Sequence, residues 1–321
     1  MVHECIGDPD NSATVSGDPV GRAANGYALT IGVFDGVHRG HQALLAATAA
    51  CAEQAGPTPA ALTFHPSPRH VLRGEGPPLI LPVAERVRLL RSYVAGEVLV
   101  HRFDTATARL SAEEFVTTLP IAGPLRTLVV GQGFRLGRNR EAGAAELTAL
   151  GSQLGWSLLV VPPVVVEDEP VSSTRIRTAV GTEGDVEGAA RLLGRPFELF
   201  GTVALGDKRG RTIGVPTANL QLETDLLVPA GGVYYCTTYC AAAGLVDAPA
   251  VVNVGVRPTF EGTVLRVEAH VLDWDGDLYD REMSLRFHDR LRDERRFTGG
   301  DELVAQIHRD VLAARSIAAT R

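Results

Sequence analysis

Short apolar runs alternate with amphipathic stretches along the first half of the chain. Residues 27–33 and 60–64 have the length and apolar content of buried strands, and each precedes a stretch with apolar residues at helical spacing. The pattern predicts strands at 27–33, 60–64, 97–101, 125–130 and 157–161, and helices at 38–55, 82–93, 111–119 and 141–154. Repeated strand–helix units are typical of a parallel sheet with helices on both faces. In such a sheet, ligands bind at the carboxyl ends of the strands.

The second half has a different pattern. Two short helices are expected between 173 and 193, and after Gly194-Arg-Pro196 short strands separated by Gly, Pro and Asp dominate. The strands are expected at 199–205, 233–239, 250–254, 265–274 and 283–287, followed by one helix from about 300 to 314. This pattern favours a small antiparallel barrel. We therefore expect a disordered tail at 1–25, one domain at 26–190 and a second at 191–321.

Composition and charge narrow the class of protein. The chain has 321 residues, 45% of them hydrophobic and 21% charged, which suits two globular domains. Its net charge of −7 argues against general nucleic-acid binding. It has no apolar run of the length that a membrane span needs, and residues 1–25 lack the apolar core of a signal peptide. The four cysteines, Cys5, Cys51, Cys236 and Cys240, show no Cys-x-x-Cys spacing, so we expect reduced thiols and a cytoplasmic protein.

The segment Thr30-Ile-Gly-Val-Phe-Asp-Gly-Val-His-Arg-Gly-His41 places two histidines at the start of a predicted helix. His38 and His41 are three residues apart, so they share one helix face. A zinc site would need a third ligand, which no nearby residue supplies at a familiar spacing, and a purely structural capping role is a second alternative. The third reading is anion binding, because free N–H groups and the helix dipole favour an anion at a helix N-terminus. Two imidazoles there could donate to the phosphate oxygens of a nucleotide.

A second segment, Ser172-Ser-Thr-Arg-Ile-Arg177, offers hydroxyl groups and guanidinium forks at another expected helix start. These are the donors that a triphosphate requires. Alone, the segment could equally be an N-capped helix with solvated arginines. Together with His38-Arg-Gly-His41, it resembles the nucleotidylyltransferase superfamily, in which such a pair of motifs brackets ATP.

The glycine-rich segment 201–219 is the first chemical feature of the second half. It carries basic residues and ends in Pro216-Thr-Ala-Asn219. Backbone N–H groups of a glycine-rich turn and basic side chains suit a polyphosphate. Thr217 and Asn219 offer a hydroxyl and an amide oxygen, which suit a hard cation such as Mg²⁺. The alternative is a charged hairpin that ends in a Pro-Thr turn.

The predicted strand around Glu268 carries the second feature. By alternation Val267, Ala269 and Val271 share one face, and Glu268 shares the other with His270. If the second face is the barrel interior, Glu268 could take a proton from a substrate hydroxyl group. The alternative is a carboxylate that faces the solvent.

The order of these motifs resembles the bacterial bifunctional riboflavin kinase/FAD synthetase family. The matching pieces include "TIGVFDGVHRGH", "SSTRIR", "GDKRGRTIGVPTANL", "NVGVRPTF", "VEAHVLDWDGDLYD" and "ELVAQIHRD", which together span residues 30 to 310. The resemblance implies a Rossmann-like nucleotidylyltransferase domain of the α/β class, followed by a flavokinase β-barrel with a carboxyl-terminal helix. It implies that the barrel phosphorylates riboflavin to FMN with ATP, and that the first domain joins FMN and ATP into FAD and pyrophosphate.

The resemblance also assigns residues. It implies that Glu268, His38 and His41 are catalytic, and that Thr217 and Asn219 handle Mg²⁺ with ATP. The nucleotide-binding residues are expected to be Gly32, Phe34, Asp35, Gly40, Ser173, Thr174, Arg177, Gly206, Lys208, Gly210, Arg211, Thr217 and Asn219. The flavin-binding residues are expected to be Asn253, Arg257, Thr259 and Arg292. The partners are small molecules alone, with no nucleic acid and no membrane, and the protein is expected to be a monomer or a weak homo-oligomer.

The sequence departs from the family pattern at four positions of the first half. Phe64-His-Pro-Ser-Pro68 carries His65 and Ser67 where an acidic residue and a histidine are usual. Gly133 replaces an Asp or Asn, and Leu136 replaces an aromatic residue. Two alternatives follow. The chain could be a riboflavin kinase with a degenerate first module, or a flavin-binding protein without turnover.

Overall fold

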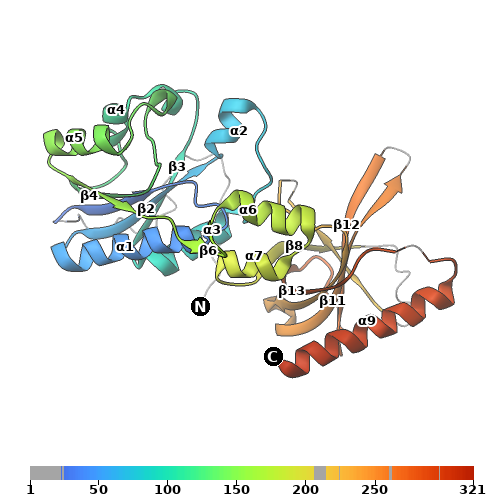
Figure 1. The fold of residues 1–321 in the computed structure, drawn as a ribbon. Helices are drawn as coiled ribbons and strands as arrows, with labels where there is room; N and C mark the ends of the chain where they lie inside the picture. The colour runs from blue at the N-terminus through green and yellow to red at the C-terminus, as the bar shows by residue number, and fades with distance from the viewer. Residues whose placement is uncertain (1–22, 24, 206–214, 224, 260–261, 296) are drawn as a thin grey trace. The chain divides into compact units, whose positions relative to one another are not determined.

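The computed structural model describes residues 23, 25–205, 215–223, 225–259, 262–295 and 297–321. The chain divides into two compact units, which are described separately (Figure 1). The first contains the chain up to Pro77 and Val83–Val165. The second contains Val166–Arg321 and also Pro78–Pro82, so a short piece of the amino-terminal half belongs to it.

The first unit is built on a parallel sheet of five strands in the order β3-β2-β1-β4-β5. The strands are β1 (Tyr27–Ile31), β2 (Thr58–His65), β3 (Glu97–Arg102), β4 (Leu125–Gly131) and β5 (Ser157–Val161). The chain runs outward from β1 to β3 and then returns to the other side of β1. The order therefore reverses between β1 and β4, which is where doubly wound sheets bind ligands. The predicted parallel sheet is confirmed.

Helices cover both faces of this sheet (Figure 1). They are α1 (Arg39–Ala55), α2 (Pro68–Arg73), α3 (Val83–Val94), α4 (Ala112–Thr117) and α5 (Ala144–Leu154). Apolar residues of α4 and α5, such as Phe115 and Leu147, pack with Leu29 on one face. On the other face α1 and α3 contact each other and the central strands. The capping box at Ser111 is present, because Ser111 accepts from the Glu114 N–H group and Glu114 from the Ser111 N–H group.

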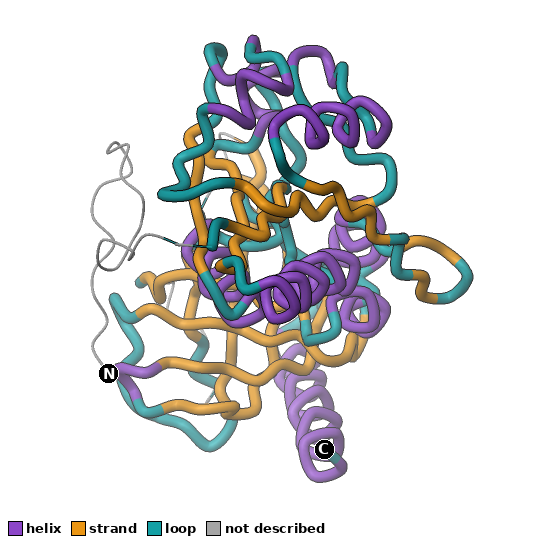
Figure 2. Tube along the Cα trace, turned by 90° about the vertical axis from the view of Figure 1, so that its left-hand side faces the viewer, coloured by secondary structure: helices purple, strands orange, loops and turns teal. Residues whose placement is uncertain are grey.

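The second unit centres on a closed six-stranded barrel in the order β10-β11-β12-β9-β8-β13, with every neighbouring pair antiparallel. The strands are β8 (Phe197–Ala204), β9 (Ala218–Gln221), β10 (Gly232–Cys240), β11 (Leu245–Thr259), β12 (Gly262–Val271) and β13 (Glu282–Arg292). Figure 2, coloured by secondary structure, shows the strands curling around the barrel. The predicted barrel is confirmed, with β9 as a strand that the sequence pattern did not indicate.

Helices precede and follow the barrel. The helix α6 (Ser173–Arg177) continues through a π-helical turn (Thr178–Glu183), and α7 (Val186–Leu193) follows. The closing helix α9 (Gly300–Thr320) packs Ala314 and its apolar neighbours against Val233 and Tyr235 of the barrel. A short pair of strands, β6 (Val165–Val166) and β7 (Glu169–Pro170), completes the elements. Among the described residues, none of the helices has the length and apolar character needed to cross a bilayer.

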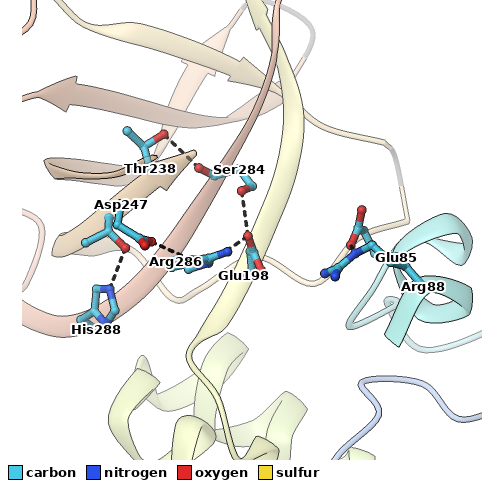
Figure 3. Close-up of polar contacts among 9 residues, drawn as sticks. Glu85, Arg88, Glu198, Thr238, Asp247, Ser284, Arg286 and His288 are labelled. Atoms are coloured by element: carbon cyan, nitrogen blue, oxygen red, sulfur yellow. Dashed lines mark hydrogen bonds and ion pairs between the residues drawn. The ribbon is translucent and has the colours of Figure 1, made fainter. Parts of the chain in front are cut away.

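A ladder of polar side chains follows the outer surface of the barrel (Figure 3). The carboxylate of Glu198 accepts from the Ser284 hydroxyl at 2.7 Å and from Arg286 at 3.2 Å. Arg286 also donates to Asp247 at 2.6 Å. These cross-strand pairs satisfy the outer face, while apolar side chains on alternate positions fill the interior.

Candidate active sites

The loop after β1 makes a strained turn. Val37 donates its N–H group to the carbonyl of Phe34 at 3.0 Å, and φ is positive at Phe34 (54°), Gly36 (85°) and Val37 (39°). A positive φ is rare for a β-branched residue such as Val37. Strained backbone of this kind is common at functional sites, and it persists only where the surrounding structure holds it in place.

The turn delivers His38 to the N-cap of α1. The His41 N–H group donates to Nδ1 of His38 at 3.4 Å, so a neutral His38 carries its proton on Nε2. The two imidazole rings stack with their centroids 3.6 Å apart and their planes 17° from parallel. His38 therefore caps the helix through Nδ1, as the structural alternative expected.

The charge state of the pair follows from its surroundings. Burial lowers the pKa of His41 well below its ordinary value, and the neighbouring His38 and Arg86 lower this pKa further. His41 is therefore neutral at neutral pH. Its Nδ1 is buried without a hydrogen-bond partner among the described residues. His41 thus offers a neutral imidazole rather than a positive charge to an anion.

The other residues predicted for this site surround the pair. Phe34 and Asp35 are buried, and the edge of the Phe34 ring meets His41 at a centroid distance of 5.2 Å. A Cβ atom on Gly32 would lie 3.1 Å from the Phe34 ring, so glycine allows this ring to lie against the strand end. Gly40 lies in the first turn of α1. The structure therefore brings these residues together at the carboxyl end of β1.

The segment Ser172–Arg177 forms α6 in the second unit. The hydroxyl of Ser172 accepts from the Arg175 N–H group at 3.3 Å, which caps the helix. Ser173 and Thr174 follow in the first turn, and Arg177 donates through Nε to the carbonyl of Pro78 at 2.7 Å. Because the histidine pair belongs to the first unit, a shared ATP site between the two segments remains a prediction.

The four departures from the family pattern have distinct places. His65 ends β2 and is exposed, and Ser67 is the N-cap of α2 without a side-chain capping bond. Gly133 has φ of 80°, and a Cβ atom there would meet nothing within 4 Å. Leu136 is buried in the apolar core. Gly133 therefore leaves open space where a polar side chain is usual, while Leu136 contributes to packing.

In the barrel, three predicted residues lie in a row across three strands. Glu268 of β12 is directly opposite Asn219 of β9 on one side and Asn253 of β11 on the other. Val267 and Ala269 are buried in the interior, so Glu268 lies on the outer face of the barrel. The sequence left two alternatives for this carboxylate, the barrel interior and the solvent. The structure shows it on the solvent side. Its side chain is 28% exposed and accepts from Arg266 at 3.2 Å.

A cavity of about 340 Å³ is lined by Ala218 and Ala269, the sequence neighbours of Asn219 and Glu268, and by none of the three residues of the row. Thr217 lines it, together with Trp274 and the loop 275–279. Nδ1 of His270 is 2.8 Å from the carbonyl of Pro216, which fixes the approach to Thr217. The indole Nε1 of Trp274 is buried without a partner among the described residues. Trp274 and His270 were not predicted as site residues, although both stand in a motif that the resemblance used.

The remaining predicted residues divide into three groups. Gly206, Lys208, Gly210 and Arg211 lie outside the described residues. Arg257 and Thr259 belong to β11, and their side chains are outside the described part. Arg292 is described, and it donates to both carboxylate oxygens of Asp310 on α9 at 2.8–3.1 Å. This guanidinium therefore fastens α9 to the barrel.

Comparisons with known proteins decide the family. A model described as FAD synthetase matches residues 21–175, and one described as riboflavin kinase matches residues 193–318. The chain is 38% identical over 296 residues to a bifunctional riboflavin kinase/FMN adenylyltransferase of Pseudomonas fluorescens, covering 92% of this chain and 94% of that relative.

The chain belongs to the bifunctional riboflavin kinase/FMN adenylyltransferase family.

A second member of the family agrees with this assignment, and a solved structure of a different description shares the fold. The family member of Escherichia coli (strain K12) is 36% identical over 292 residues, which is 90% of this chain and 92% of the relative. A crystal structure described as a macrolide-efflux protein from Streptococcus pneumoniae aligns with a TM-score of 0.82 at 33% identity. The alignment covers 90% of this chain and 94% of that one. The resemblance seen in the sequence is thereby confirmed.

Proposed function

We propose that the chain catalyses two consecutive transfers, phosphorylation of riboflavin to FMN by ATP and adenylylation of FMN to FAD with release of pyrophosphate. The observation that carries the proposal is the row of Asn219, Glu268 and Asn253 in a chain of this family. Thr217, two residues before Asn219, lines a cavity of the same barrel. Each transfer then has its own set of polar groups.

For the kinase reaction, we assign the general base to Glu268, whose partly exposed carboxylate on the outer face of the barrel a substrate hydroxyl group could reach from the solvent side. It takes the proton of the terminal ribityl hydroxyl group as the oxygen attacks the γ-phosphorus, and ADP leaves. Thr217 and Asn219 present the hydroxyl and amide oxygens that Mg²⁺ accepts, and Mg²⁺ is commonly held by few protein groups together with substrate phosphates. Among the described residues no cluster of three His, Cys, Asp or Glu side chains could hold a metal, which fits such a shared site. When bound with ATP, Mg²⁺ supplies charge neutralisation to the phosphates.

We assign the flavin to the same end of the barrel. Asn253 lies next to Glu268, so its amide could hydrogen-bond the ribityl chain or the ring. Arg257 and Thr259 continue the same strand. Arg292 acts indirectly in this proposal, because its forked contact with Asp310 sets the position of α9.

For adenylylation, a phosphate oxygen of FMN attacks the α-phosphorus of ATP, and pyrophosphate leaves. Because Nδ1 of His38 accepts the N-cap bond, its Nε2–H group is the donor that we assign to a phosphate oxygen. His41, kept neutral by burial, shares the site with Gly32, Phe34, Asp35 and Gly40. Ser173, Thr174 and Arg177 are proposed to complete the ATP site. Catalysis here consists of positioning and charge stabilisation, without a covalent intermediate.

A product assay tests the proposal. The protein is incubated with riboflavin, ATP and Mg²⁺, and the flavins are separated by chromatography. FAD as the final product supports both transfers. FMN that accumulates supports a kinase with a degenerate first module, which the open space at Gly133 favours. Flavin binding without any product would contradict both enzymatic outcomes and would show a flavin-binding protein without turnover.

The division of labour and the cellular location are also proposals. We assign adenylylation to residues 26–190 and phosphorylation to 191–321, because the two family models end at 175 and begin at 193. We place the protein in the cytoplasm as a monomer or weak homo-oligomer. The free thiols of Cys51, Cys236 and Cys240 support a reducing compartment.

A further inference from the structure

A buried arginine lies beneath the turn that carries the histidine pair. Arg86 of α3 has only 1% of its surface exposed and is among the largest fully buried side chains of the protein. Burial lowers the pKa of this guanidinium, and the nearby Asp35 raises it. Removing a guanidinium from water is costly unless its donors are paired. Two nitrogens of Arg86 are paired with backbone carbonyls, while its Nε is buried without a hydrogen-bond partner among the described residues.

The fork of Arg86 joins the ends of two strands. Its Nη1 donates to the carbonyl of Val33 at 3.0 Å, just after β1, and its Nη2 donates to the carbonyl of Phe64 at 3.1 Å, near the end of β2. The hydroxyl of Thr63 donates to the same Val33 carbonyl at 2.9 Å. Both acceptor positions of this carbonyl are thus occupied by side chains from neighbouring elements.

The carbonyl of Val33, which accepts hydrogen bonds from Arg86 and Thr63, directly precedes the strained turn. Phe34, with positive φ, follows it directly, and Val37, also with positive φ, leads into His38. Such backbone persists only where its surroundings over-determine it. At the far end of the turn, Gln42 donates to the carbonyl of Val37 at 2.9 Å. The turn is therefore held at both ends, and Arg86 and Thr63 hold the end that adjoins the sheet.

We infer that Arg86, assisted by Thr63, is a positioning residue for adenylyl transfer, because its fork fixes the turn that presents His38 and His41 to the nucleotide. The inference rests on the proposed adenylyltransferase function of the first unit. Arg86 also places a positive charge close to His41. The other titratable group that acts on His41 is His38, and Asp35 acts on Arg86. A site for a polyphosphate benefits from that charge, because the His41 imidazole itself stays neutral.

Three variants and one control test this role. Arg86→Met removes the fork and the charge but keeps the volume, Arg86→Lys keeps the charge, and Thr63→Val removes one hydroxyl donor. The control is Arg88→Met on the same helix, since Arg88 is 61% exposed and only pairs with Glu85 at 2.6 Å (Figure 3). Riboflavin phosphorylation by the same molecules reports that the second unit is intact.

We expect Arg86→Met to lower kcat for FAD formation by on the order of 10²-fold per folded molecule, because small misplacements of a reacting group have effects of this size. KM for ATP should change less than kcat. Thr63→Val should lower kcat by about 10-fold, Arg86→Lys should recover part of the loss, and Arg88→Met should match the wild type. The folded fraction is measured from the circular-dichroism melt of each variant.

A second measurement does not depend on turnover. In an NMR titration the pKa of His41 should rise in Arg86→Met and stay near the wild-type value in Arg86→Lys. Amide exchange at residues 34–37 should accelerate in Arg86→Met and Thr63→Val. Unchanged kcat, unchanged exchange and an unchanged His41 titration in folded Arg86→Met would overturn the inference. If the wild type makes no FAD, the proposed function fails, while exchange and titration still decide whether Arg86 holds the turn.

Discussion

Replacing Glu268 by Gln separates the chemistry of the barrel from its stability. Gln keeps the length of the side chain and can still accept from Arg266, so the row with Asn219 and Asn253 stays filled. The lost ion pair is 28–30% exposed, and pairs of this kind contribute about 0–1 kcal/mol to the free energy of unfolding. Loss of a general base, by contrast, lowers a rate by about 10²–10⁴-fold. We therefore expect Glu268→Gln to fold normally and to lose nearly all riboflavin phosphorylation.

The assay follows FMN by chromatography at saturating riboflavin and Mg²⁺-ATP. The matched control is Glu282→Gln, an exposed glutamate at the start of β13 in the same barrel, which should keep its activity. Conversion of added FMN to FAD should be unchanged in both variants, because Glu268 has no part in that reaction. A Glu268→Gln protein that retains more than about a tenth of the wild-type kcat would refute the assignment of a base.

Three further results are expected. His41→Gln should lower FAD formation from FMN by about 10²-fold, as loss of one donor to a transition state does, with FMN formation unchanged; equal loss of both activities in folded protein would contradict separate sites. Asp310→Asn breaks the partly buried pair with Arg292, so it should lower the free energy of unfolding by up to about 3 kcal/mol and speed amide exchange in α9. An unaltered urea midpoint would show that the pair is not needed for stability. Folding lowers the pKa of His41 and His101, so the unfolded chain binds more protons than the folded chain as the pH falls through about 6.5. The melting temperature should therefore fall between about pH 8 and about pH 5.5. The fall should be less steep in His41→Gln, which lacks one of the two histidines.

The sequence pattern predicted the sheet and the barrel because both depend on periodicity. Buried strands such as β1 read as continuous apolar runs, and the alternation around Glu268 separated the two faces of β12 correctly. It could not say which face was the interior, since that depends on how the barrel closes. Short elements were missed for a related reason. The helix α2 and the strand β9 have six and four residues, too few for a period to show.

The site was predicted in part. His38, His41 and their neighbours in "TIGVFDGVHRGH" lie in one continuous segment, so the sequence places them together. Arg86 was not found, because an arginine in an amphipathic helix normally faces the solvent, as Arg88 on the same helix does. Its partners are backbone carbonyls, which leave no trace in the amino-acid pattern. Trp274 was missed because its place beside Thr217 depends on the path of the loop after β12.

Because the five residues Pro78–Pro82 belong to the second unit but lie within the sequence of the first, no single truncation point separates the two units. Leu79 bridges to Leu226 and exchanges hydrogen bonds with the backbone of Asp225 and Leu227, all within the second unit. A shortened protein that starts after residue 165 would lack this strip and expose the groups that it covers. A shortened protein that stops there would carry the strip with nothing to pair with. Any attempt to express the halves alone, or to exchange them between relatives, has to treat this strip as a piece of the other half.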